Sequence, residues 1–168
     1  LCFFSFNSTK KANSVIDSKG IVIVEKYKLE YRGNVKEFED YILDNLRREQ
    51  EQGQSLRWSK FVEVYARQLA IIQECPYPET ESELGNDETP PSIKLIDQNT
   101  EYVGSFYRWG LHVVGIGNFR VIFCIHNYYK VVLLHQFDKK YNGAIRKEDL
   151  TPAEAEYERL CYEEPQRN

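Results

Sequence analysis

Apolar residues recur with two different periods along the chain, and these periods predict its helices and strands. Residues 20–32 are rich in β-branched and aromatic side chains that partly alternate with polar ones, which is typical of one long strand. Residues 35–51, and the stretch from Gly53 to Cys75, carry apolar side chains at spacings of three and four, which predicts two amphipathic helices. Because only a short glycine-containing turn separates these helices, we expect an αα-hairpin.

Three further strand-like segments follow, at residues 101–114, 119–126 and 130–137. Residues 115–118 (Gly-Ile-Gly-Asn) separate the first two, and residues 127–129 (Asn-Tyr-Tyr) separate the last two. Both are short segments of the residue types that form tight turns. The three strands are therefore predicted to form an antiparallel meander.

Two sequence patterns predict where helices begin. Asn34 followed by Glu37 has the spacing of a capping box and marks the start of the first helix. Thr151, Pro152 and Glu154 place a capping side chain, a proline suited to the first helical position and an acidic residue at the third. We therefore expect a last helix that runs through about residue 162.

The predicted order β-α-α-β-β-β-α indicates an α+β fold, with an antiparallel sheet of about four strands, an N-terminal αα-hairpin and a C-terminal helix. A length of 168 residues suits a single domain, here 20–162, with an N-terminal arm at 1–19 and a tail at 163–168. Residues 76–92 are rich in proline and acidic side chains and contain no basic residue. They are expected to form an exposed loop inserted into the domain, either a lid or a linker.

Composition excludes several classes of protein. With 42% hydrophobic and 29% charged residues, the chain is neither disordered nor fibrous. It contains no apolar run near the roughly 18 residues of a membrane span, and its first residues make a poor secretory signal, so we expect a cytoplasmic protein with no membrane contact. The four cysteines are scattered and no histidine stands at zinc-ligand spacing, so neither a metal site nor a disulfide framework is expected. No cofactor-binding motif is present.

Charge is distributed unevenly along the chain. The net charge is −4, yet residues 105–150 hold seven Lys and Arg against three Asp and Glu. The candidate phosphate ligands in and after the predicted strands are Arg108, Arg120, Lys139, Lys140, Arg146 and Lys147. With nearby histidines and tyrosines they indicate a phosphate-binding surface suited to RNA, although a solvated charged surface is the alternative interpretation. A structural role is expected for His126, while structural and functional roles both remain open for His135.

Four features of residues 105–160 follow one another in a recognisable order. They are Tyr107-Arg108 in an aromatic strand, Gly117-Asn118-Phe119-Arg120-Val121 at a turn and strand, Leu-Leu-His-Gln-Phe-Asp-Lys-Lys at 133–140, and Thr151-Pro152-Ala153-Glu154 at a helix. This series resembles the RelE/ParE toxin superfamily, in particular its HigB-like branch, which includes phage-derived proteins. The resemblance implies a RelE-like fold.

The resemblance also implies the toxin component of a bacterial type II toxin-antitoxin system, held inactive by a cognate antitoxin protein. Many such toxins cleave mRNA on the ribosome without a metal ion: the 2′-hydroxyl attacks the adjacent phosphate, and basic side chains stabilise the developing charge. By motif position, Arg120 is the main phosphate-stabilising candidate, supported by Arg108, Lys139 and Lys140. His135 and Tyr141 are the candidates for proton transfer.

Two other functions remain open on the same resemblance. RelE-like folds include gyrase-directed toxins without ribonuclease activity, so a noncatalytic binding protein, gyrase-directed or phage-related, is a second hypothesis. A degenerate, non-toxic relative is the third. It is suggested by the acidic overall charge and by the insertion at 76–92, which could cover the basic face.

Overall fold

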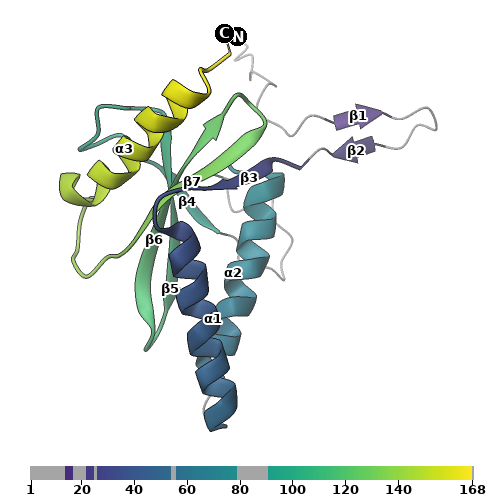
Figure 1. The fold of residues 1–168 in the computed structure, drawn as a ribbon, viewed down its shortest axis with the longest axis vertical. Coiled ribbons are helices and arrows are strands. Elements are labelled where there is room, and N and C mark those ends of the chain that lie inside the picture. Colours follow the sequence, from purple (N-terminus) through teal and green to yellow (C-terminus); the bar gives the residue numbers. More distant parts are fainter. Residues whose placement is uncertain (1–13, 17–21, 25, 54–55, 79–90, 168) are drawn as a thin grey trace, which may run out of the picture.

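The computed structural model describes residues 14–16, 22–24, 26–53, 56–78 and 91–167 (Figure 1). Its main sheet has five strands in the order β3-β7-β6-β5-β4. They are β3 (Lys28–Tyr31), β4 (Ser92–Leu95), β5 (Phe106–Val113), β6 (Gly117–His126) and β7 (Lys130–Asp138). All neighbours pair antiparallel except β3 and β7, which run parallel. The fold is α+β as predicted and the meander β5-β6-β7 is confirmed, but the sheet is mixed.

Helices cover both faces of this sheet. The helices α1 (Val35–Gln52) and α2 (Arg57–Glu74) form the predicted αα-hairpin on one face, while α3 (Lys147–Glu163) packs on the other (Figure 1). Gly53 ends α1 with φ +60°, a left-handed conformation that glycine adopts without a steric penalty. The helix pair and the terminal helix are therefore confirmed.

Side-chain alternation along the central strands separates two hydrophobic cores. In β6, Phe119, Val121 and Phe123 pack against α1 and α2. Ile122 and Cys124 point the other way and pack under α3. Both faces of the sheet are therefore apolar beneath the middle of the helices.

The N-terminal part differs from the predicted single strand over 20–32. β2 (Val22–Val24) pairs antiparallel with β1 (Ser14–Ile16) in a separate two-stranded sheet, and only β3 joins the main sheet. Between β2 and β3, Tyr27 is buried and its backbone N–H donates to a carbonyl of α2. This anchor to the helical face interrupts the strand. Apart from β1, the predicted arm over 1–19 lies outside the described residues.

The strand β4 was not expected, so the prediction of about four strands is corrected to five. It begins at Ser92, directly after two prolines, and has four residues, which is too short for a hydrophobic period to identify it. Most of the predicted acidic loop, residues 79–90, lies outside the described residues.

Both predicted capping patterns are wrong in detail, although α1 begins where expected. The Asn34 side chain makes no cap; it donates to the Gln136 carbonyl and accepts from the Gln136 N–H, both at 2.8 Å, and so links α1 to β7. α3 begins at Lys147, four residues before Thr151, and includes Pro152. The proline is tolerated because the carbonyl that it leaves without a helical donor belongs to exposed Glu148 near the helix start.

Candidate functional site

Charged side chains gather on the α3-side face of the sheet, beyond the part that α3 covers. On β5, Arg108 follows buried Phe106 at a spacing of two, and on β6, Arg120 precedes buried Ile122 at the same spacing. Arg108 pairs with Ile122 in register, and Gly110 pairs with Arg120. The two arginines are therefore diagonal neighbours on one face of adjacent strands.

A β-bulge brings His135 to the same face. The β6–β7 register shifts between Ile122 and Phe123, so that Phe123 pairs with Leu133 while Ile122 pairs with His135. Without the extra residue Leu134, His135 would pair with a residue that faces α1 and α2. Bulges re-aim side chains in this way. The open face therefore holds Arg108, Arg120 and His135 together.

Arg120 is held firmly through one guanidinium nitrogen, and its Nη2 makes no hydrogen bond within the described residues. One guanidinium nitrogen, Nη1, donates to Asn118 Oδ1 and to the Phe119 carbonyl, both at 2.7 Å. Its Nε is buried and has no hydrogen-bond partner among the described residues. Burial and the positive charge of Arg108 lower the pKa of Arg120. The structure therefore places a partly desolvated guanidinium, with no carboxylate partner in the described part of the chain, on the open face.

The loop after β7 forms the edge of this site. The ammonium of Lys139 donates to the carbonyls of Tyr141 (3.2 Å) and Gly143 (2.7 Å) and lies 4.7 Å from the centre of the Tyr141 ring. The Arg146 guanidinium lies 4.2 Å from the same ring centre. The Tyr141 hydroxyl donates to Asp149 and accepts from the Arg146 N–H. Tyr141 therefore organises two cations, and its own proton is directed at a carboxylate.

Asn118 links two of the cations, because it accepts a hydrogen bond from Arg120 and donates one to the Lys139 carbonyl. Burial lowers the pKa of Lys139, and the positive charges of Arg120 and Arg108 lower it further, whereas Asp149 acts in the opposite direction. Like charges at close range are unfavourable unless an anion joins them. The arrangement is therefore suited to bind an anion such as a phosphate.

His135 has the properties of a neutral proton acceptor. Its ring is half-buried and stacks on Phe137 with ring centres 6.1 Å apart. Burial lowers its pKa below 6.5, partly opposed by Asp149. Its ring nitrogens make no hydrogen bond within the described residues. At neutral pH the imidazole is thus uncharged beside a cationic surface.

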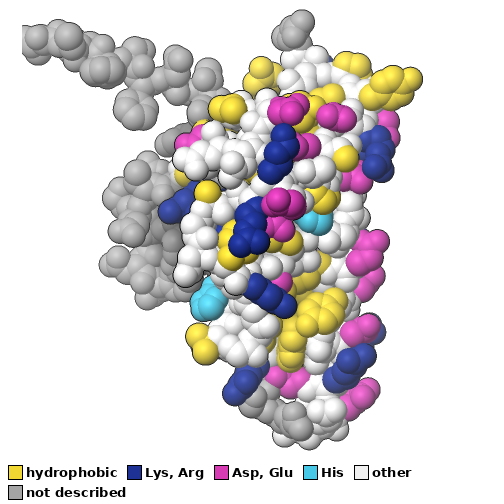
Figure 2. Space-filling view, turned by 90° about the vertical axis from the view of Figure 1, so that its left-hand side faces the viewer, with side chains coloured by type: hydrophobic (Ala, Val, Ile, Leu, Met, Phe, Trp, Pro, Cys, Tyr) yellow, Lys and Arg dark blue, Asp and Glu magenta, His cyan; other side chains and the backbone are white. Residues whose placement is uncertain are grey.

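Two predicted phosphate ligands lie at the edge of this cluster. Lys140 has a side chain that is 82% exposed and pairs with Asp138 at 3.5 Å, and Lys147 pairs with Glu101 at 3.4 Å. The structure therefore brings together the other six candidate site residues, namely Arg108, Arg120, His135, Lys139, Tyr141 and Arg146. Figure 2 shows Lys and Arg side chains at several levels of this side of the molecule.

Sequence reasoning missed three contributors to the site. Exposed Lys94 of β4 pairs in register with Arg108, so it adds a cation to the same face. Gly110 leaves space for the Arg120 guanidinium, and Asp149 anchors Tyr141. The strand β4 had no detectable period, so no signal in the sequence could have placed Lys94.

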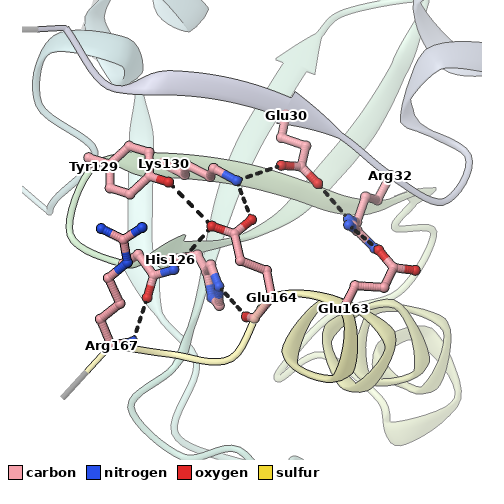
Figure 3. Close-up of polar contacts among 9 residues, drawn as sticks. Glu30, Arg32, His126, Tyr129, Lys130, Glu163, Glu164 and Arg167 are labelled. Atoms are coloured by element: carbon pink, nitrogen blue, oxygen red, sulfur yellow. Dashed lines mark hydrogen bonds and ion pairs between the residues drawn. The ribbon is translucent and has the colours of Figure 1, made fainter.

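A second polar cluster is structural (Figure 3). Lys130 is buried and pairs with Glu164 and Glu30, and Arg32 pairs with Glu30 and Glu163. The hydrogen bond from Lys130 lowers the pKa of Glu164 to about 2. These contacts tie the end of α3 to β3 and to the start of β7.

His126 belongs to the same structural cluster. It is fully buried, and its Nε2 lies 2.8 Å from the Glu164 carbonyl oxygen, as expected for a structural histidine.

Comparison with protein-family models, with curated proteins and with solved structures gives no match. Among the described residues, no helix is both long enough and apolar enough to cross a membrane. The functional argument therefore depends on the site.

Proposed function

We propose that this protein is a metal-independent mRNA endoribonuclease of the RelE/ParE, HigB-like kind, the toxin of a type II toxin-antitoxin pair that acts on the ribosome. One observation carries the proposal: Arg108 and Arg120 are diagonal neighbours on one open sheet face that also holds His135, and Lys139 lies at its edge. The motif series at 105–160 supports the family assignment.

The chemistry requires one cation and one proton acceptor in the same place. The 2′-hydroxyl oxygen bonds to the adjacent phosphorus, the bond from phosphorus to the 5′-oxygen breaks, and the products are a 2′,3′-cyclic phosphate and a 5′-hydroxyl. Negative charge increases on the phosphoryl oxygens in the transition state, and the Arg120 guanidinium, whose Nη2 makes no hydrogen bond within the described residues, can stabilise it. Arg108 on β5 and Lys94 on β4 extend the positive surface across the sheet toward its edge.

His135 takes the proton of the 2′-hydroxyl in this scheme. A neutral imidazole with a pKa below 6.5 is in its acceptor form at neutral pH. The departing 5′-oxygen takes a proton from water, and the His135 imidazolium gives its proton to the hydroxide that remains. Tyr141 is less suited to that step because burial and its bond to Asp149 raise its pKa, and we assign it the positioning of Lys139 and Arg146.

A noncatalytic binding protein on the same fold is the second candidate. The observation that favours it is the number of internal contacts at the site: Lys139 donates to two carbonyls and Tyr141 donates to Asp149. A cationic surface of this kind can bind an acidic partner, for example gyrase, without proton transfer.

Induced expression in a bacterial host separates these candidates. We expect growth arrest accompanied by shortened mRNA, lost in Arg120→Ala and kept in Arg47→Ala, where Arg47 is an exposed arginine of α1 paired with Asp44. Co-expression of an adjacent antitoxin reading frame should restore growth. Arrest with intact mRNA would favour the binding protein, and arrest that Arg120→Ala does not relieve would contradict the role of Arg120.

A further inference from the structure

A polar pocket of about 300 Å³ lies where α1, α2 and the β5–β6 turn meet. Arg48 from α1, Arg57 and Trp58 from α2, and Gly115 from the turn are among its lining residues. Its volume is at the lower end of the roughly 300–1,000 Å³ of small-ligand pockets. It can therefore hold a group of about the size of one nucleotide.

The two arginines of this pocket are available to an anion. Arg48 and Arg57 are exposed, and neither makes an ion pair within the described residues, whereas the adjacent Arg47 pairs with Asp44 at 3.0 Å. Planar guanidinium groups bind phosphate oxygens through two parallel hydrogen bonds. The pocket thus offers two such groups at one place.

The carboxylate of Glu49 also lines the pocket but is fully occupied. Its Oε1 accepts from the Trp58 N–H at 2.9 Å, and its Oε2 accepts from the N–H (2.9 Å) and hydroxyl (3.1 Å) of Ser59. Burial opposes its charge, but these bonds lower its pKa overall. Glu49 therefore fixes the first turn of α2, including Arg57 and Trp58, and leaves the pocket with a net positive charge.

Trp58 adds an aromatic surface. Its ring is half-buried and is held by edge contacts with Tyr41 and Phe61, with ring centres 5.6 and 5.7 Å apart. Proteins that bind single-stranded RNA combine cations that follow the backbone with aromatic rings on which bases stack. Arg48, Arg57 and Trp58 provide this combination.

A second groove connects the pocket to the site on the sheet. This groove, of about 380 Å³, is lined by His112, Lys140 and Lys139 and shares Gly115 and Ile116 with the pocket. Lys139 is also part of the cationic cluster around Arg120. Asn118, which accepts a hydrogen bond from Arg120, lines this groove, so a polar surface continues from Arg120 to the pocket. Figure 2 shows Lys and Arg side chains on this side of the molecule, with Asp and Glu side chains among them.

We infer that the pocket of Arg48, Arg57 and Trp58 binds a phosphate and the adjacent base of the same RNA strand whose cleaved phosphate lies at Arg120. The inference rests on the proposed function. It defines the direction of the bound strand: from the open sheet face, around the β5–β6 turn, to the αα-hairpin.

The test measures binding of 2′-O-methyl RNAs, which lack the attacking hydroxyl, by fluorescence anisotropy. Oligomers of about 4 and about 12 nucleotides cover the usual site sizes of single-strand binders. We expect Arg48→Ala with Arg57→Ala to weaken the longer RNA at least about tenfold and the shorter one little, because only the longer strand spans both sites. For this double variant, the slope of log K against log salt concentration with the longer RNA should be smaller in magnitude by about 0.7, the value for one phosphate of a single strand.

Arg47→Ala is the matched control and should leave both RNAs unchanged. Trp58 provides a second readout that needs no substitution, because the other tryptophan, Trp109, is fully buried: the longer RNA should quench tryptophan fluorescence. Equal affinities for the double variant and Arg47→Ala would overturn the inference. The inference would also be overturned if a free mononucleotide quenched the fluorescence with the same apparent Kd as the longer RNA.

The proposed function can fail separately from this inference. If Arg120→Ala still cleaves RNA while the double variant loses the longer strand, the pocket stands and the catalytic assignment is wrong. If Arg120→Ala abolishes cleavage and the double variant binds normally, the catalytic assignment stands and the pocket is wrong. Absence of all binding to the free RNAs would overturn the pocket, and cleavage on the ribosome would still test the proposed function.

Discussion

The guanidinium carbon of Arg120 lies 3.6 Å from the position that a Cβ atom would take at Gly110, on the neighbouring strand. The two residues pair in register, and the missing side chain at Gly110 is the space that the guanidinium occupies. A contact of 3.6 Å is ordinary van der Waals packing, so one methyl group fits but a larger side chain does not.

Substitutions at Gly110 should therefore separate size from backbone effects. Gly110→Ala should keep RNA binding and raise strand stability by about 0.5 kcal/mol, because alanine loses less backbone freedom on folding. Gly110→Leu should displace the guanidinium and weaken RNA binding at least about tenfold. Anisotropy titrations and thermal unfolding measure the two effects. Equal binding by both variants would contradict this position for Arg120.

The pH dependence of cleavage should report His135. Its pKa lies below 6.5, so the acceptor form predominates above that lowered value and is lost as the pH falls through it. The cleavage rate should rise with pH, with a midpoint below pH 6.5, and then level off. His135→Gln should be slower and lack this step. A step of the same size in His135→Gln would assign the titration to another group.

Glu164 should stabilise the fold above acidic pH. The hydrogen bond from Lys130 lowers its pKa from 4.5 to about 2, although burial opposes this. A lowered carboxylate pKa gives stability that is complete above pH 4.5 and is lost as the pH falls through about 2. Glu164→Gln should therefore lower the Tm at pH 7, and the difference from the unmodified protein should disappear near pH 2.

Exposed Glu51 of α1 is the control for this titration, since it makes no ion pair in the described chain. Glu51→Gln should change the Tm little at either pH. A Glu164→Gln difference that persists unchanged at pH 2 would show that the effect is not electrostatic.

A buried hydrogen bond joins α2 to the sheet: Trp109 Nε1 donates to Gln68 Oε1 at 2.8 Å. Both side chains are buried, so Gln68→Leu leaves the indole N–H without a partner. We expect a loss of about 2 kcal/mol in the free energy of unfolding, measured by urea denaturation. Adding Trp109→Phe should recover part of that loss. The exposed substitution Gln50→Leu should stay within about 0.5 kcal/mol.

The helices and the meander could be predicted because their apolar periods extend over many residues, as in α1 and α2. The split of residues 20–32 could not, because the run from Gly20 to Arg32 contains no turn residue after its first position. The break comes from a tertiary contact, the backbone bond that holds Tyr27 to α2. Local sequence does not contain such contacts.

The candidate site shows the same division. A spacing of two relates Arg108 to Phe106, so its face follows from the strand period once the buried face is known. The face of His135 does not follow, because the bulge at Ile122 and Phe123 reverses the alternation along β7. Bulges depend on the pairing of two strands, and a single sequence does not specify that pairing.

The central claim, cleavage of mRNA by a site built around Arg120, is tested most directly by primer extension on a defined mRNA in a cell-free translation extract. The purified protein, Arg120→Ala and Arg47→Ala are added in parallel. We expect new 5′ ends that require ribosomes, appear equally with Arg47→Ala and fall by about 10²–10³-fold with Arg120→Ala, the usual effect of removing a transition-state donor. Intact mRNA with the folded protein, or undiminished new ends with Arg120→Ala, would contradict the claim.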